Sequence, residues 1–138
     1  ELHKALSAQR GEPDTRLFRL PTETEWEWAA SGGKRPYPWS EEKPDKTNAN
    51  YDEEVGQTTP VGAYPAGATP EGLMDMAGNV WEWMENLYGH EKYPVARALR
   101  GGSWVDLADD LRCAARDYFN PADVWDLNIG FRLVCVPS

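Results

Sequence analysis

One stretch of the 138-residue chain decides what kind of fold it can adopt: Gly72-Leu-Met-Asp-Met-Ala-Gly-Asn-Val-Trp-Glu-Trp83. Its last part, residues 79–84, places Trp81 and Trp83 on one face by the period-two alternation of a β-strand. The glycines and polar residues before that strand are typical of an ordered loop. The stretch therefore predicts a strand that leaves a loop and brings two large aromatic side chains to one face.

Upstream of this stretch, a capping box predicts a helix that begins at Thr22. The Thr22 side chain can accept a hydrogen bond from the amide of Glu25, while the Glu25 carboxylate accepts one from the amide of Thr22. Gly32-Gly33 ends the helix with residues that readily take a positive φ. The apolar stripe at helical spacing consists of Trp26, Ala29 and Ala30. A second, shorter helix is predicted over residues 2–6.

Two further strand candidates lie downstream. Residues 99–104 indicate a strand broken by glycines, and residues 129–136 alternate along their whole length, with Cys135 at the inward-facing parity of a buried thiol. Between them, only residues 111–115 carry a short helical pattern. Residues 34–71 are rich in turn residues but contain aromatic side chains, so we expect long ordered loops. This pattern predicts an α+β domain whose function lies on loops.

Composition limits the classes of protein to which the chain can belong. Hydrophobic residues make up 41% of the chain, which contains seven tryptophans, six tyrosines and three phenylalanines. This is enough to build one core and hence one domain. The net charge of -9 disfavours nucleic acid, and no run of eighteen apolar residues predicts membrane insertion. The first residues, from Glu1, contain neither the apolar stretch of a signal peptide nor an initiator methionine, so we expect the chain to begin within a longer protein, and localisation stays open.

Several motifs occur in a characteristic order along the chain. They are Arg19-Leu-Pro-Thr-Glu-Thr-Glu-Trp-Glu-Trp-Ala-Ala, Tyr37-Pro-Trp, Asn48-Ala-Asn50, Thr59-Pro-Val-Gly, the stretch from Gly72 to Trp83, Leu99-Arg-Gly-Gly-Ser-Trp104, Leu111-Arg-Cys-Ala-Ala-Arg116 and Ile129-Gly-Phe-Arg132. Together they resemble the formylglycine-generating enzyme (sulfatase-modifying factor) domain, a relative of the C-type lectin fold. The resemblance implies an α+β, loop-rich domain with short antiparallel strands and one or two helices. It runs from Arg19 to Val136, so residues 1–138 are expected to be the C-terminal part of a single such domain.

The enzymes of this family are copper-dependent oxidases that use two cysteines placed shortly after the Gly-Gly-Ser-aromatic motif. Here residues 105–110 contain no cysteine. Cys113 belongs to a motif that the family carries in addition to its catalytic pair, and aspartate cannot replace the thiolates that select Cu(I). We therefore expect neither copper nor oxidase activity.

A second group on the same scaffold accounts for this difference. In the variable proteins of diversity-generating retroelements, adenine-specific mutagenesis rewrites AAC codons in a region that ends near Ile-Gly-Phe-Arg. Adenine-reachable residues are scattered through residues 105–128, with Trp125 reachable from an AGG codon, while residues 111–116 stay intact. The candidate ligand-binding positions are Val105, Asp106, Leu107, Asp109, Asp110, Asp117, Tyr118, Phe119, Ala122, Asp123, Val124, Trp125, Asp126 and Leu127.

These positions, which we call the window, have the composition of a recognition surface. Aromatic side chains on rigid loops supply contact area at low entropy cost, and six aspartates favour a basic or hydroxyl-rich partner. No histidine lies in the window, so a nucleophile and base pair is absent. The hypothesis is a non-enzymatic receptor for an unknown ligand, a protein or another macromolecule. Exposure of Tyr118, Phe119 and Trp125 on one continuous face would support it.

Members of the family often bind structural calcium, which prefers carbonyl and carboxylate oxygens in irregular loops. Matching the motifs implies a first site with Asn50, the carbonyl of Tyr51, Glu53 and the carbonyl of Val55. A second site would use Asp75, the carbonyls of Gly78 and Val80, and the carboxylate of Glu82.

Three alternatives remain at this stage. The chain can be a copper oxidase of the formylglycine-generating type or a degenerate relative of it. It can be a sulfoxide synthase of thiohistidine biosynthesis, although that enzyme needs a histidine-rich iron site. The aspartates can also be an ordinary solvated face. Most tryptophans belong to scaffold motifs and are expected in the core or in hydrogen-bonded framework positions: Trp26, Trp28, Trp39, Trp81, Trp83 and Trp104.

Overall fold

The computed structural model describes residues 17–119 and 126–136, and the helix predicted over residues 2–6 lies outside them. Within these ranges the chain forms one α-helix, two 3₁₀ turns and six short strands. The elements are β1 (Leu17–Arg19), α2 (Glu23–Ser31), η1 (Pro65–Gly67), β2 (Trp81–Leu87), β3 (Arg97–Arg100), η2 (Ala108–Leu111), β4 (Asp117–Phe119), β5 (Ile129–Gly130) and β6 (Val134–Val136). The predicted α+β class is confirmed.

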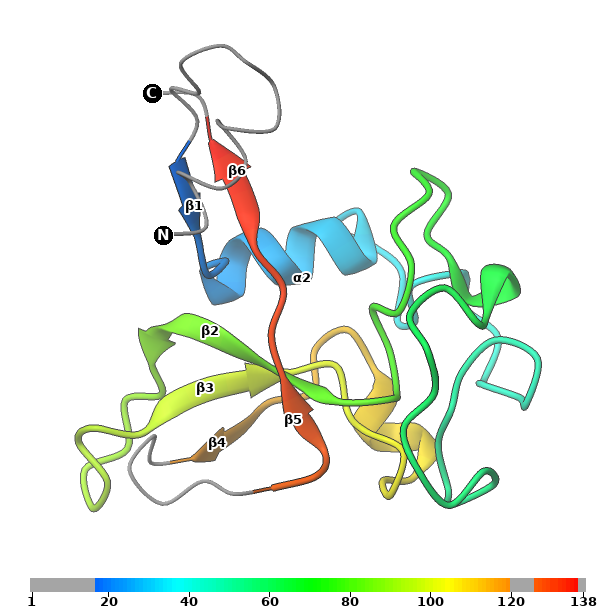
Figure 1. Ribbon diagram of the computed structural model, residues 1–138. Coiled ribbons are helices and arrows are strands. Elements are labelled where there is room, and N and C mark those ends of the chain that lie inside the picture. Colours follow the sequence, from blue (N-terminus) through cyan, green and yellow to red (C-terminus); the bar gives the residue numbers. More distant parts are fainter. Residues whose placement is uncertain (1–16, 120–125, 137–138) are drawn as a thin grey trace, which may run out of the picture.

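The strands form two sheets. A four-stranded sheet has the order β4-β3-β2-β5, in which β5 runs parallel to β2 and the other pairs are antiparallel. A separate antiparallel pair joins β1 to β6. In Figure 1, this pair projects away from the four-stranded sheet, while the loops between α2 and β2 gather at the opposite side of the molecule.

Helix α2 begins and ends where the sequence predicts. Thr22 is the N-cap residue, and both hydrogen bonds of its capping box with Glu25 are present. Gly32 ends the helix at φ 57°, in the left-handed region that glycine favours. Arg19 donates to the Glu25 carboxylate, and together with the amide of Thr22 it lowers the pKa of Glu25 to about 2.

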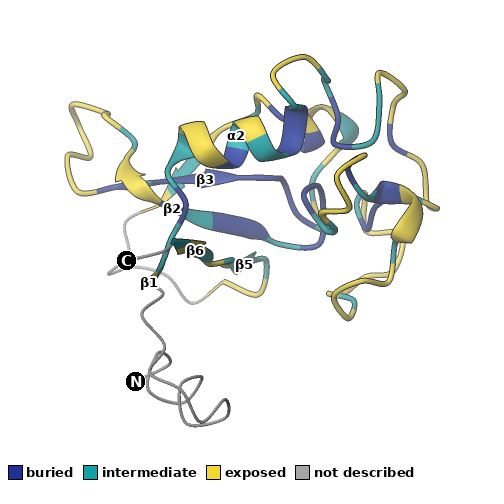
Figure 2. Cartoon of the chain, turned by 90° about the horizontal axis from the view of Figure 1, so that it is seen from above, coloured by how far each residue is buried: buried dark blue, intermediate teal, exposed yellow. Residues whose placement is uncertain are grey.

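The core consists of two clusters. The first lies between α2 and the four-stranded sheet, where buried parts of the helix and of β2 and β3 face each other in Figure 2. The second lies among the loops and includes Leu111 of η2. The first cluster contains Trp26, Ala30, Met76, Met84, Ala98 and Cys113. The second contains Tyr37, Ala49, Ala77 and Leu111. The loop cluster explains how residues 34–71 stay ordered with only one 3₁₀ turn, as the sequence predicts.

The prediction of one strand over residues 129–136 is wrong. Residues 129–130 pair with β2 and residues 134–136 pair with β1, so the alternating segment serves two sheets. Arg132, between these two short strands, reaches Glu82 on β2. Cys135 is exposed rather than buried, because β6 belongs to a sheet of only two strands.

Three smaller differences concern local structure. The strand predicted over residues 99–104 ends at Arg100, and the helical turn predicted over residues 111–115 instead occupies η2. Trp28 is 68% exposed, although its motif places it in the framework. A helix turns about 100° per residue, so a residue two positions after the buried Trp26 points away from the sheet. In the described ranges, no helix has the length and apolar character needed to cross a bilayer.

Candidate functional site

The first half of the window, residues 105–110, is carried by the glycine turn that follows β3. At Gly102, with φ 70°, an added Cβ would lie 2.9 Å from the carbonyl oxygen of Asp110 and 2.9 Å from a methyl carbon of Leu111. Glycine at this position therefore lets η2 pack directly against the turn. Leu111, 0% exposed, anchors η2 in the loop cluster and leaves the residues before it at the surface.

Asp106 is held by the scaffold more firmly than its neighbours in the window. Its carboxylate accepts hydrogen bonds from the amide of Ser103, at 2.9 Å, and from the Ser103 hydroxyl. Its carbonyl oxygen accepts the amide of Asp52 at 2.8 Å. Ser103 is fully buried and also accepts a hydrogen bond from Asn128. Asp106 is thus a window position whose side chain also stabilises the turn that begins at Ser103.

The described window positions lie at or near the surface, whereas two framework residues between them, Leu111 and Cys113, are buried. None of the ten candidate positions in the described ranges is buried. Seven are exposed: Val105, Leu107, Asp109, Asp110, Phe119, Asp126 and Leu127. Three are half-buried: Asp106, Asp117 and Tyr118. By contrast, Leu111 and Cys113 are 0% and 2% exposed. The predicted positions Ala122, Asp123, Val124 and Trp125 lie outside the described residues.

Strand β4 divides the last part of the window between two faces. Tyr118 pairs with Ala98, which is 0% exposed and faces α2, whereas Asp117 and Phe119 point to the other face of the sheet. Tyr118 is half-buried and Phe119 is 37% exposed. The two aromatic side chains therefore lie on opposite faces of the sheet, and the single continuous face that would have supported the recognition hypothesis is not formed by these two residues. Burial, together with the charges of Asp106 and Asp110, raises the pKa of Asp117.

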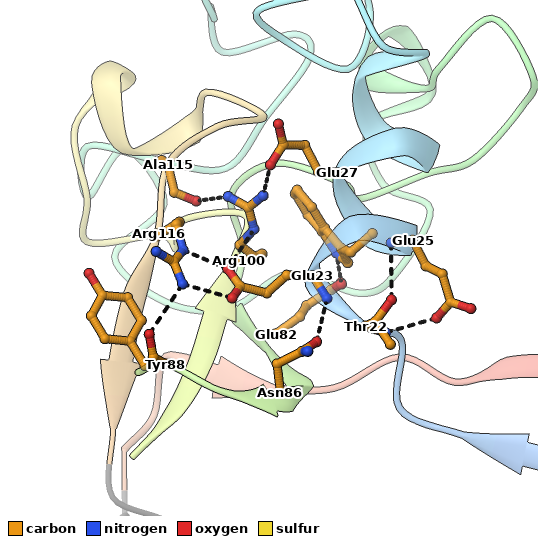
Figure 3. Close-up of polar contacts among 11 residues, drawn as sticks. Thr22, Glu23, Glu25, Glu27, Glu82, Asn86, Tyr88, Arg100, Ala115 and Arg116 are labelled. Carbon is orange, nitrogen blue, oxygen red and sulfur yellow. Dashed lines mark hydrogen bonds and ion pairs between the residues drawn. The ribbon is translucent and has the colours of Figure 1, made fainter. Parts of the chain in front are cut away.

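A polar network around the buried Arg100 fixes the framework next to the window. The Arg100 side chain is 1% exposed, forms an ion pair with Glu27 and donates to the carbonyl oxygen of Ala115 at 2.8 Å. Arg116 donates to both oxygens of the Glu23 carboxylate, at 2.6 and 2.8 Å (Figure 3). This bidentate pair joins Arg116 of the Arg-Cys-Ala-Ala-Arg motif to the first turn of α2. The network ties residues 115–116 to α2 and thereby positions β4.

The two predicted calcium loops differ in what they offer a cation. In the first, Asn50 is 1% exposed, and its side-chain oxygen is buried with no hydrogen-bond partner, while its amide donates to the carbonyl of Gln57 at 2.9 Å. Asp52 and Glu53 adopt positive φ values of 53° and 54°. An unpartnered buried acceptor is costly, and a cation would satisfy it. The first loop therefore fits calcium.

The second predicted calcium site does not fit the metal. Both oxygens of the Glu82 carboxylate accept hydrogen bonds from Arg132, at 2.7 and 2.8 Å, and one accepts a third from the Trp26 indole at 2.7 Å. Arg132 also donates to the carbonyl oxygen of Asp75 at 3.0 Å. The Asp75 carboxylate accepts the amide of Gly62 at 2.7 Å. The chain itself places a positive charge where the ion would lie.

The two thiols occupy different parts of the fold. Cys113 lies in the core cluster below α2, and burial raises its pKa to about 11. Cys135 lies on β6 in the two-stranded sheet. A copper-binding pair needs two thiolates that converge on one ion, and these elements do not bring the thiols into one cluster.

One feature near the window is not apparent from the sequence motifs. Tyr88, His90 and Tyr93, in and beside the β2–β3 connection, form ring contacts with Tyr118 or with one another. His90 is exposed but stacks on Tyr118 with ring centroids 5.4 Å apart. The available signal was the density of rings in residues 88–93, which belongs to none of the motifs.

The family described as Sulfatase-modifying factor enzyme 1-like domain matches residues 4–136. This chain belongs to that family. Treponema denticola variable protein 1 has a similar structure, with a TM-score of 0.73 and 35% identity, over 88% of this chain and 48% of that protein. The C-type lectin fold of the formylglycine-generating-enzyme type is thereby confirmed.

Relatives in sequence carry several different names. A serine/threonine-protein kinase pkn1 of Chlamydia caviae is 47% identical over 83% of this chain and 20% of the kinase. The hercynine oxygenase of Mycobacterium tuberculosis is 40% identical over 75% of this chain and 29% of that enzyme. Inactive C-alpha-formylglycine-generating enzyme 2 of Bos taurus is 37% identical over 83% of this chain and 42% of that protein. The chain spans less than half the length of each, so the domain is shared between enzymes and proteins named inactive.

Proposed function

We propose that this domain is a non-enzymatic ligand-binding protein, the variable protein of a diversity-generating retroelement, which presents diversified side chains on a constant C-type lectin scaffold. One observation carries the proposal. The adenine-reachable positions of the window are at the surface or half-buried wherever they are described, whereas Leu111 and Cys113 between them are buried.

The energetic difference between these two groups makes diversification tolerable. Substitution of an exposed side chain without special contacts typically changes stability by less than about 0.5 kcal/mol. Truncation of a buried leucine costs about 2–5 kcal/mol, which is a large share of the stability of a small domain. A scaffold that varies only its exposed positions therefore keeps its fold while its binding specificity changes.

The present side chains favour a basic macromolecular partner. Asp109, Asp110 and Asp126 are exposed, and the Asp109 side chain is 83% exposed. Leu107 and Leu127, 61% and 84% exposed, add apolar contact area beside these charges. Charges at the rim of an interface guide association, and the apolar and aromatic side chains supply most of its affinity.

Calcium in the first loop would support this scaffold. The side chains of Asn50 and Glu53, with the carbonyls of Tyr51 and Val55, would hold the ion. The amides of Asp52 and Glu53 donate to the carbonyls of Asp106 and Trp104, each at 2.8 Å, so the loop braces the first half of the window. The ion would stiffen the base of a binding surface and would take no part in chemistry.

A copper oxidase or its degenerate relative is the second candidate, favoured by the similarity to hercynine oxygenase and to an inactive formylglycine-generating enzyme. The buried Cys113 thiol, with its pKa of about 11, opposes the active form, because the thiolate is the metal ligand. Stoichiometric copper uptake with oxidation of a cysteine-containing peptide would establish the enzyme and refute the proposal.

A paired library experiment tests the proposed function. In one displayed library, the seven exposed positions of the window are randomised together; in the control library, three buried framework positions, Leu99, Leu111 and Cys113, are randomised. We expect most members of the first library to be folded and some to bind an arbitrary target such as cytochrome c after selection. Members of the control library should be largely unfolded.

Two results would contradict this function. One is a window library that unfolds as often as the control library. The other is a genomic locus with neither a reverse transcriptase gene nor a near-copy of the window that carries AAC codons. Either would favour the degenerate enzyme.

A further inference from the structure

Four aromatic rings meet where the β2–β3 connection passes β4. The Tyr118 ring centroid lies 4.5 Å from that of Tyr88, 5.4 Å from that of His90 and 5.6 Å from that of Tyr93. His90 and Tyr93 also contact each other, with centroids 5.3 Å apart. Tyr118 is thus the ring that touches all three of the others. It belongs to the window, and the other three do not.

We call residues 88–96, which connect β2 to β3, the aromatic hairpin. Apart from the ring contacts with Tyr118, this segment has few contacts with other elements. Residues 89–95 are all exposed, including Tyr93 at 40% and Val95 at 59%. The amides of Tyr88 and Tyr93 donate to carbonyl oxygens within the hairpin, those of Ala96 and His90, while the Tyr88 carbonyl oxygen accepts a hydrogen bond from Arg116 at 3.4 Å. At its first residue the hairpin is anchored through Tyr88, which packs against the core cluster and whose ring centroid lies 4.4 Å from the Arg116 guanidinium. For His90 and Tyr93, the described ring contact with another element is the stack on Tyr118.

We propose that the aromatic hairpin is a second, constant part of the recognition surface and that the residue at position 118 sets its conformation. This inference rests on the proposed function, because it takes position 118 as diversified. Changing Tyr118 to aspartate, which is equally reachable from an AAC codon, removes three ring contacts at once. One diversified position then alters a surface of nine residues, 88–96, that the mutagenesis itself leaves unchanged.

The chemistry of the hairpin fits a basic protein surface. Tyrosine and histidine rings provide rigid, amphipathic contact area at low entropy cost, as in antibody binding loops. The Lys92 ammonium lies 5.3 Å from the Tyr93 ring centroid, so this ring already presents a face to a cation. An arginine or lysine of the partner fits the same kind of contact. The exposed aspartates of the window carry the complementary charge.

Hydrogen–deuterium exchange of the free protein tests the coupling without any ligand. In Tyr118→Asp, we expect the backbone amides of residues 88–96 to exchange about tenfold faster or more, because the ring contacts that restrain them are lost. In Tyr118→Phe, which keeps the ring, exchange should stay within about twofold of the wild type. The matched control is Phe119→Asp, one residue away on the opposite face of β4, which should leave the hairpin unchanged.

The amides of Leu99 and Met84 report whether each variant is folded, since both residues are buried in strands next to the hairpin. The inference is overturned if hairpin exchange is equal in Tyr118→Asp and the wild type, or if it rises as much in Phe119→Asp. A rise that also affects Leu99 and Met84 would show general unfolding, and it would equally refute a specific link from position 118 to the hairpin.

A second measurement tests the role in recognition. Every member of the window library keeps Tyr118, which is not one of the seven randomised positions. Among its binders of cytochrome c, we expect Tyr93→Ala to weaken binding by about fivefold or more, whereas Val61→Ala, in an exposed loop outside the window, should not. Unchanged affinity in Tyr93→Ala would remove the hairpin from the recognition surface. If no binders emerge at all, the proposed function fails, while the exchange experiment still decides whether position 118 controls the hairpin.

Discussion

The molecule contains two populations of carboxylates, and they behave in opposite ways. Glu82 is 5% exposed and accepts three hydrogen bonds from Arg132 and Trp26. Asp109, in the window, has an 83% exposed side chain, and its partner Arg112 lies 3.5 Å away. A buried charge destabilises the fold unless an opposite charge pairs with it, whereas an exposed charge is solvated by water. We therefore expect substitutions of buried framework residues to destabilise the fold and substitutions of exposed window residues to be tolerated.

The largest expected effect comes from breaking the framework pair. Among the described residues, Arg132→Met leaves the buried Glu82 carboxylate with the Trp26 indole as its remaining donor, and it should lower the free energy of unfolding by about 3–5 kcal/mol. Arg112→Met, which removes an exposed arginine from a weak pair, should change it by less than about 1 kcal/mol. Urea unfolding followed by tryptophan fluorescence measures both. Equal losses would erase the distinction between the two carboxylate populations.

Two leucines four residues apart test the same contrast without charge. Leu111 is 0% exposed and anchors η2, whereas Leu107 is 61% exposed. Leu111→Ala should cost about 3 kcal/mol, because it leaves a cavity in the loop cluster. Leu107→Ala should stay within about 0.5 kcal/mol of the wild type. The comparison of the two unfolding curves is direct, since both variants lose the same atoms; a Leu107→Ala variant as unstable as Leu111→Ala would mean that the window supports the core.

How far the sequence predicts these contrasts depends on the range of the interaction. The capping box of Thr22 and the glycine that ends α2 involve residues close together in the chain, and both were correctly placed. The alternation in residues 129–136 is also local, but it carries no information on which strand each half will pair with. The segment was therefore predicted as one strand although it divides between β2 and β1.

The same reasoning applies to the window. The pattern of adenine-reachable residues identified the candidate binding positions, and most of those in the described ranges are exposed. The buried framework residues Leu111 and Cys113 hold the segment that carries them against the core. The ring partners of Tyr118 come from residues 88–93, about 25 positions earlier, and no spacing rule links the two segments. Asp106 is a third case: its bond to Ser103, three residues before it, is local, yet the codon argument treated it like its neighbours.

Asp106 and Asp110 allow the same comparison between a fixed and a free carboxylate within the window. Asp106→Ala removes the acceptor of two hydrogen bonds from Ser103, one of them from a buried hydroxyl, and should cost about 1–2 kcal/mol. Asp110→Ala, at an exposed position of η2, should cost less than about 0.5 kcal/mol. Thermal or urea unfolding distinguishes them. If both variants are equally stable, position 106 is as freely variable as the rest of the window.

The smallest expected effect concerns Asp117, which lies between the two populations because it is half-buried and has no counter-charge among its described contacts. Burial, then the charges of Asp106 and Asp110, raises its pKa in the folded protein above the unfolded value. A raised carboxyl pKa means that the folded state binds the proton more tightly, so stability is fully present below the unfolded pKa and falls as pH rises through the folded pKa.

Asp117→Asn should therefore stabilise the protein slightly at pH 7, and this gain over the wild type should shrink towards pH 3, where both side chains are neutral. Urea unfolding at the two pH values measures the difference. A gain that is the same at pH 3 and pH 7 would show that the charge of Asp117 is as well solvated as that of an exposed window residue.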